Sequence, residues 1–330
     1  MHELSGPIGC GYMSFKHLGK GLSMLRGILF IAPMLALTSL VSVAHCQEVV
    51  NTSDSPQWSS GPTIVTQKPA GPRKPPVGLS TEWITDSQFG LVTTEATTTL
   101  PLLFLGTPPP LVKVGFAYTD LFAQSEFDLP DDLYEYTIGL SWFRKINDRW
   151  TVRTMIGVGL ATDNQNTSSE AYQFRGGMFA IYEKTEQLSW TLGAIALGRD
   201  DLPVVPAIGA VWMPNPTMRW DLTFPKPRLN VLLSETNERQ RWAYFGAGIN
   251  GTTWGYEKTD TTGDRLTYKD IRVVIGWESR PASAANLPFA PGKTTQAEIG
   301  YVFSRELEFD DESRVEPLVD SFMFGVSTKF

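Results

Sequence analysis

The last ten residues, Ser321–Phe330, constrain the fold of this 330-residue chain more than any other stretch. Extended, they would place on one face Phe322, Phe324, Val326, Thr328 and Phe330, and on the other Ser321, Met323, Gly325, Ser327 and Lys329. A soluble protein rarely ends on a strand with a bare apolar face, because such an edge promotes aggregation. In a membrane barrel that face meets lipid, and the last strand pairs with the first. The pattern favours a membrane barrel over the last strand of a soluble sandwich.

The composition agrees with a barrel and argues against most enzymes. A hydrophobic content of 42% and a mean hydropathy of −0.12 exclude a bundle of membrane helices but suit strands with one lipid-facing side. The net charge of −7 argues against a nucleic-acid partner. All histidines and cysteines lie at or before residue 46, namely His2, His17, His45, Cys10 and Cys46. If that region is removed on export, the mature chain has no imidazole or thiol, so we expect no enzyme and no cofactor, with carboxylate-only chemistry the remaining possibility.

Residues 1–46 are predicted to be an export signal. An apolar stretch at 28–43 is interrupted by Pro33 and is short for a spanning helix. It follows a basic region that contains Lys16, Lys20 and Arg26. The basic region has a long extension before it, so translation could start at Met13 or Met24. Cleavage after Cys46 and lipidation of Cys46 are both open.

Residues 47–87 are predicted to be a disordered periplasmic linker, because they are rich in Pro, Ser and Gly and show no apolar periodicity. A plug inside the barrel is the alternative role for this segment.

The chain from residue 88 to 330 is predicted to be an up-and-down antiparallel β-barrel. Most of its extended segments have 8–14 residues, which is enough to cross a bilayer at a barrel tilt. The predicted strands are 89–104, 111–120, 133–144, 149–161, 171–184, 187–199, 204–213, 217–224, 227–234, 241–257, 266–279, 294–306 and 318–330. This odd number conflicts with both ends of the chain lying on one side. We expect about twelve strands, with 217–234 as one kinked strand; a hidden strand at 77–86 would give fourteen.

Short and long connections alternate along this region, as in outer-membrane barrels, and tryptophans lie beside those on the side where the chain ends. Indole prefers the boundary between water and lipid. The predicted interface girdle consists of Trp142, Trp150, Trp190, Trp212, Trp220 and Trp277. Trp242 is its weakest member, since the alternation with Phe245 favours an inward orientation.

In several predicted strands, charged residues fall on the face that points into the barrel, the same face as a glycine near the middle of the strand. The predicted lumen charges are Arg153, Arg175, Arg219, Asp221, Arg272 and Glu298. They could form a satisfied internal network or a pore constriction in which arginine faces Glu298. The glycines could bend the strands or keep the lumen from filling.

Three motifs resemble a family of predicted bacterial outer-membrane β-barrel proteins of unassigned function. They are Pro214-Asn-Pro216, Trp220-Asp-Leu-Thr-Phe-Pro-Lys-Pro-Arg228 and Gly300-Tyr-Val-Phe-Ser-Arg-Glu-Leu-Glu-Phe309. The resemblance covers about residues 88–330 and supplies no catalytic residues. Phe330 also resembles the terminal signal by which the barrel-assembly machinery recognises such barrels for insertion.

Together these observations predict a protein of the bacterial outer membrane, with the lipid bilayer and the assembly machinery as partners. The expected function is a passive channel or small-solute transporter. The alternative is a barrel with a closed lumen that acts through its extracellular loops.

Overall fold

The computed structural model describes residues 75–330, apart from 87, 107, 124–126, 200–201, 261, 283–291 and 311–313. All of these residues belong to the unit that spans Cys46–Phe330. The export signal predicted at 1–46 and the linker as far as residue 74 lie outside the described residues. Cleavage or lipidation at Cys46 and the plug role therefore stay predictions.

The described residues form β-strands connected by loops and short 3-10 helices, and none of their helices is long and apolar enough to cross a membrane. The elements in chain order are β1 (Val77–Thr85), β2 (Phe89–Pro101), η1 (Leu103–Leu105), β3 (Leu111–Ala123), β4 (Asp132–Lys145), β5 (Trp150–Thr162), η3 (Ser169–Ala171), β6 (Tyr172–Thr185), β7 (Leu188–Ala196), β8 (Val204–Asn215), β9 (Met218–Asp221), β10 (Arg228–Glu235), β11 (Arg239–Glu257), β12 (Gly263–Pro281), β13 (Thr294–Phe309), β14 (Arg314–Leu318) and β15 (Ser321–Lys329).

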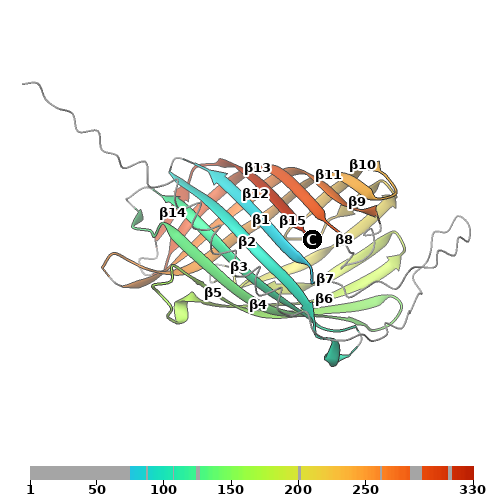
Figure 1. Cartoon of the computed structure of the whole chain (residues 1–330), viewed down its shortest axis with the longest axis horizontal. Helices are drawn as coiled ribbons and strands as arrows, with labels where there is room; N and C mark the ends of the chain where they lie inside the picture. Colours follow the sequence, from blue (N-terminus) through green and yellow to red (C-terminus); the bar gives the residue numbers. More distant parts are fainter. Residues whose placement is uncertain are drawn as a thin grey trace, which may run out of the picture. The chain divides into compact units, whose positions relative to one another are not determined.

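The strands form a closed antiparallel barrel in chain order (Figure 1). Closure occurs between the first and the last strand, in a register that runs from Gly78 opposite Lys329 to Thr85 opposite Phe322. Trp83 stacks on Phe324 across this seam, with ring centroids 5.5 Å apart. The apolar terminal strand therefore has a partner on each edge, as the sequence predicted.

The barrel has fourteen strands, so the expectation of about twelve was wrong. β14 and β15 pair with successive parts of β13 and count as one interrupted strand. The alternative strand at 77–86 exists as β1, and the predicted linker therefore extends no further than residue 76. Residues 217–234 form two separate strands, β9 and β10, because Pro225 and Pro227 lack the N–H groups that a continuous strand needs.

We call the end of the barrel that contains Phe330 the turn end and the opposite end the loop end.

The inner and outer faces of the barrel wall differ in chemistry. In β15, Phe322 and Phe324 are exposed and alternate with the buried side chains of Ser321 and Met323. Large apolar side chains are exposed on the outer face of many strands, among them Ile138, Ile156, Met178, Leu192, Ile208, Phe245, Ile275, Ile299 and Phe322.

An apolar cluster fills part of the barrel at the loop end. Its buried members are Ile84, Phe89, Leu91, Leu121, Phe127, Leu133, Ala161, Trp254, Tyr256, Leu266, Tyr268, Val302, Leu307, Phe309, Leu318 and Met323. The side chain of Arg305 is fully buried there and lies 2.9 Å from the carboxylate of Asp86. It also donates to the carbonyl oxygens of Val319 (2.8 Å) and Phe89 (2.5 Å) and to the Tyr268 hydroxyl (3.2 Å). Arg305 thereby joins β13 to the β1–β2 turn.

The long hairpin of β11 and β12 crosses the loop end and reaches β5. Thr162 and Gly255 form a parallel pairing between β5 and β11. The carboxylate of Asp163 accepts from the backbone N–H of Glu257 at 2.8 Å, and the amide of Asn166 donates to the backbone of β11 at 3.1 Å. These contacts divide the loop end into two parts, one over β1–β5 and the other over β6–β10.

Candidate functional site

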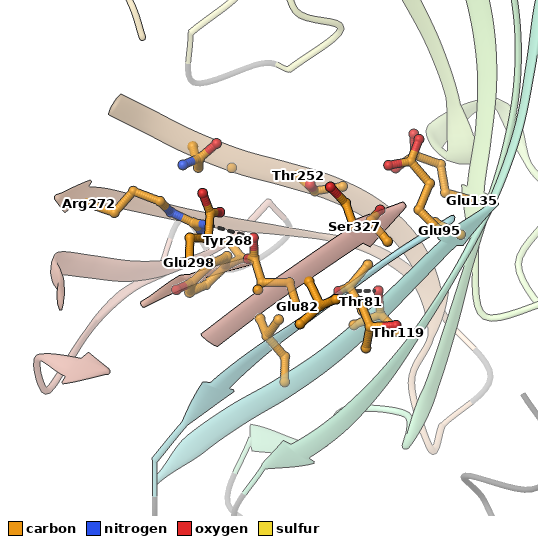
Figure 2. A pocket seen from close by; sticks show the side chains of 18 of the residues that line it. Thr81, Glu82, Glu95, Thr119, Glu135, Thr252, Tyr268, Arg272, Glu298 and Ser327 are labelled. Atoms are coloured by element: carbon orange, nitrogen blue, oxygen red, sulfur yellow. Dashed lines mark hydrogen bonds and ion pairs between the residues drawn. The ribbon is translucent and has the colours of Figure 1, made fainter. Parts of the chain in front are cut away.

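The interior of the barrel contains a polar cavity of about 340 Å³, which we call the acidic cavity. It is lined by the carboxylates of Glu82, Glu95, Glu135 and Glu298 and by one cation, Arg272. Glu95 and Glu135 lie together at one side of it, whereas Glu82, Arg272 and Glu298 gather at the other (Figure 2). Inward residues of β1, β2, β4, β12 and β13 thus contribute most of its charge.

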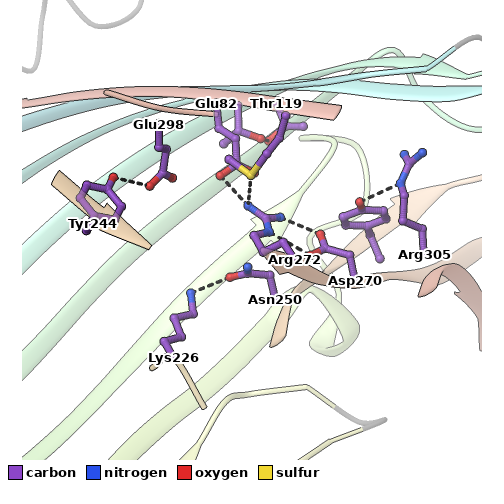
Figure 3. A network of polar contacts seen from close by, with 12 residues as sticks. Glu82, Thr119, Lys226, Tyr244, Asn250, Asp270, Arg272, Glu298 and Arg305 are labelled. Carbon is purple, nitrogen blue, oxygen red and sulfur yellow. Dashed lines mark hydrogen bonds and ion pairs between the residues drawn. The ribbon is translucent and has the colours of Figure 1, made fainter. Parts of the chain in front are cut away.

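Arg272 is held by two carboxylates (Figure 3). Its Nη2 and Nε donate to the two oxygens of Asp270 at 2.6 and 2.9 Å, a bidentate geometry, and its Nη1 lies 2.8 Å from Glu82. Arg272 therefore pairs with Glu82 and Asp270, and not with Glu298, the carboxylate that the constriction alternative put opposite arginine. Glu82 is its partner across the closure of the barrel, where the sequence predicted linker.

Glu298 pairs instead with Tyr244, whose hydroxyl donates to it at 2.6 Å. The same hydroxyl accepts from Gln296 at 2.7 Å, and the guanidinium of Arg228 lies 3.5 Å from the centre of the tyrosine ring. The ring covers Gly276, where a Cβ atom would overlap it. This glycine therefore lets an aromatic side chain lie flat along the wall, a role that neither interpretation of the glycines included.

A second cavity of about 470 Å³, the basic cavity, shares Glu95 and Glu135 with the acidic cavity. Its lining contains five cations, namely Lys113, Arg153, Arg175, Arg199 and Lys226. Two of them pair with the shared carboxylates, since Arg175 lies 2.6 Å from Glu135 and Lys113 lies 3.6 Å from Glu95. The two cavities therefore adjoin, and carboxylates outnumber cations in the lining of the acidic cavity whereas cations outnumber carboxylates in that of the basic cavity.

Near the turn end, a smaller cavity of about 190 Å³ contains Arg219 and Asp221. Arg228 and Glu278 form an ion pair of 2.7 Å in its wall. The six predicted lumen charges therefore all line interior cavities, but the structure distributes them over three. Arg272 and Glu298 line the acidic cavity, Arg153 and Arg175 line the basic cavity, and Arg219 and Asp221 line the turn-end cavity.

Several residues of these cavities were missed by sequence reasoning. Glu82 lay in the predicted linker, although its strand alternates. Lys226 lies between Pro225 and Pro227, a segment that seemed to require only a turn, yet its ammonium donates to Asn250 inside the barrel at 2.5 Å. The alternation along their strands indicated that Asp270 and Glu135 point into the barrel, but it could not identify their partners.

The predicted girdle tryptophans lie beside turns at the turn end. Five have exposed side chains on the outer face: Trp142, Trp150, Trp190, Trp212 and Trp277. Trp220 is half-buried and packs edge-on against Trp212, with centroids 5.0 Å apart. Trp242 is buried and lines the turn-end cavity, as its alternation with Phe245 indicated.

No group of three or more His, Cys, Asp or Glu side chains in the described part of the chain could hold a metal ion. In the part of the chain that the structure describes, the polar interior offers pairs of opposite charge and hydrogen-bond donors to a solute.

Several solved structures are similar to this chain over most of their own length. No curated protein matches the chain. Among solved structures, the chain is similar to the NanC porin (9% identity, 77% of this chain and 98% of that chain, TM-score 0.36) and to the KdgM porin (8%, 77% and 98%, 0.32). It is also similar to the outer membrane protein Omp33 of Acinetobacter baumannii (10%, 78% and 96%, 0.30).

A family model described as a domain of unknown function, DUF6268, matches residues 111–316, which is more than half of the chain. The match confirms the predicted resemblance to a family of unassigned function, and it covers part of the predicted range of 88–330. It contains most strands of the barrel and the three motifs of the sequence. The chain belongs to the DUF6268 family.

Proposed function

We propose that this protein spans the bacterial outer membrane and forms a channel for small solutes. The membrane location is supported by the exposed apolar outer face, because soluble monomers rarely expose contiguous apolar patches larger than a few hundred Å². A closed barrel satisfies its backbone hydrogen bonds internally, as a bilayer requires. Insertion through recognition of Phe330 belongs to the same proposal.

The tryptophan girdle gives this location a direct test. In bilayers, fluorescence from Trp142, Trp150, Trp190, Trp212 and Trp277 should be quenched most by lipids brominated near the headgroup, because indole concentrates at the interface. Equal quenching by mid-chain bromines would contradict the girdle. Trp242 and Trp254 are buried inside the barrel and should contribute an unquenched background.

The channel function is carried by one observation: charges that point inward remain exposed to water. The side chains of Lys113 and Glu95 are 58% and 43% exposed although both line the interior. Water in the lumen would account for this exposure, since a charge without water or a partner is costly. The adjoining acidic and basic cavities then supply a path lined by polar groups.

The path would leave the barrel beside the β11–β12 hairpin rather than through the apolar cluster. The basic cavity extends to the loop between β7 and β8, which contributes Leu197 and Leu202, and to the loop between β9 and β10, which contributes Pro225 and Lys226. Strands β7–β10 are short at this end, so the wall is low where these loops lie.

A pair of neighbouring substitutions tests the channel. Gly139 lines the basic cavity, so Gly139→Trp should put an indole into the path and reduce the single-channel conductance severalfold in planar bilayers. Ile138→Trp is the control: the backbone of Ile138 borders the same cavity, but its side chain is exposed on the outer face, so the indole would meet lipid. Equal conductance in the two variants would contradict the path.

The apolar cluster supports a second candidate function, a closed barrel that acts through its loops. It fills the loop end over β1–β5 and leaves only the side over β6–β10 for passage. A parent protein that is folded, as its heat-modifiable gel mobility would show, but conducts no ions would favour this candidate.

A further inference from the structure

Two cations of the basic cavity have no carboxylate partner among the described residues. Arg153 donates from Nε to the hydroxyl of Ser141 at 3.4 Å, and its guanidinium lies 5.0 Å from the centre of the Phe143 ring. Among the described residues, Lys226 donates only to the amide oxygen of Asn250. The side chain of Arg153 is half-buried and that of Lys226 is exposed, and both line the cavity.

These two side chains differ from the other cations of the interior. Arg272 and Arg175 each have a carboxylate within 2.8 Å. A half-buried cation without a carboxylate beside it, such as Arg153, is stabilised when an anion enters the cavity, and an exposed cation such as Lys226 adds attraction for that anion. The planar guanidinium of Arg153 suits a carboxylate, whereas the ammonium of Lys226 acts as a point charge.

The same cavity has an apolar part. Ile195, Leu197, Leu202 and Val205 come from β7, β8 and the loop between them and contribute to its lining. The nearby part of the wall, beyond β6, carries no side chain at Gly139 and Gly157, which are paired in the register of β4 and β5. A volume of about 470 Å³ lies within the range of small-molecule sites, which combine apolar walls with a few polar groups.

We propose that the basic cavity binds a small carboxylate with an apolar body. The carboxylate would lie between Arg153 and Lys226, and the apolar part would pack against Ile195, Leu197, Leu202 and Val205. This inference rests on the proposed channel, because it identifies the class of solute that would pause in the lumen. The excess of cations in this cavity and of carboxylates in the acidic cavity would then hold an anion on one wall of the path.

The test is a calorimetric titration of the folded, full-length protein in a nonionic detergent with hexanoate, with a detergent-only blank. Hexanamide is the neutral probe of matched shape, and inorganic phosphate is the anion without an apolar body. Hexanoate should bind at least about tenfold more tightly than either, because it alone supplies both a charge and an apolar chain.

Arg153→Gln and Lys226→Gln should each weaken hexanoate binding about tenfold, the value of one charge-assisted hydrogen bond. The controls are Arg144→Gln and Lys145→Gln, which remove cations at the turn end that line none of the cavities described above. Removal of an unpaired cation leaves no carboxylate orphaned, so both cavity variants should fold, and their heat-modifiable mobility checks this.

Equal binding of hexanoate and hexanamide would overturn the site, as would unchanged binding in both cavity variants. Equal binding of phosphate would overturn the assignment of an apolar body. The titration does not depend on conduction. Selective binding in a protein without conductance would support this inference and contradict the channel proposal. Conductance without selective binding would support the channel proposal and contradict this inference.

Discussion

Arg305→Gln should lower the free energy of unfolding by about 3–5 kcal/mol, the usual cost of removing one partner of a buried ion pair. The substitution leaves the carboxylate of Asp86 without its cation and removes the donors to Val319 and Phe89. The β1–β2 turn would then lose its connection to β13. Urea unfolding of the protein refolded into lipid vesicles measures this change.

The double variant Asp86→Asn, Arg305→Gln is the control, because it removes both charges. It should be more stable than the sum of the two single changes predicts, and strict additivity would show that the ion pair contributes nothing. Burial alone would raise the pKa of Asp86, but hydrogen bonds from the N–H groups of Gln88 and Phe89 and from Arg305 hold it below its usual range.

The sign of the pH dependence follows from this lowered pKa. A carboxyl group whose pKa is lower in the folded state stabilises the fold above its unfolded pKa, about 3.9, and loses that contribution as the pH falls toward the folded value. The stability of the parent protein should therefore decrease below about pH 4, and less so in Arg305→Gln.

Arg272→Glu should have a comparable cost, about 3–5 kcal/mol, because it puts a third carboxylate beside Asp270 and Glu82. The side chain of Asp270 is fully buried, so water cannot compensate for the repulsion. Thermal unfolding measures the loss, and single-channel reversal potentials in a salt gradient measure selectivity. Any molecules that do fold should conduct anions less readily, relative to cations, than the parent protein does, because a lumen cation has become an anion.

Arg153→Glu is the matched control, since Arg153 has no carboxylate partner among the described residues. It should alter selectivity in the same direction with a much smaller loss of stability. If Arg272→Glu proved as stable as the parent protein, the carboxylates around it would have to be solvated, and the lumen would be more open than these contacts indicate.

The strands could be predicted from the sequence because membrane strands alternate with a strict period of two. In β4 and β5 the period follows from apolar residues at every second position, such as Ile138 and Leu140 or Ile156 and Val158. β1 was only the alternative to the predicted linker, because it follows a proline-rich stretch. β9 was too short, at four residues, to be distinguished from a kink.

Parity also predicted which charges face inward, but it could not pair them. Glu82 and Arg272 are 190 residues apart and meet only because the barrel closes between β1 and β15. The position of Lys226 depends on a loop that folds inward, and no period describes a loop. Tyr244 was missed because its role depends on the space above Gly276, a residue on the neighbouring strand.

The junction between β5 and the β11–β12 hairpin has a mechanical consequence. A simple barrel can deform evenly around its circumference, but a contact between two distant strands across one end fixes the distance between them. Asp163 and Asn166 make such contacts with β11 at the loop end. Elastic strain would therefore concentrate where the pairing between neighbouring strands is weakest. That place is β9, which shares only three aligned residue pairs with β8. Deformation of the wall by a passing solute would therefore be concentrated along β8–β10, beside the basic cavity.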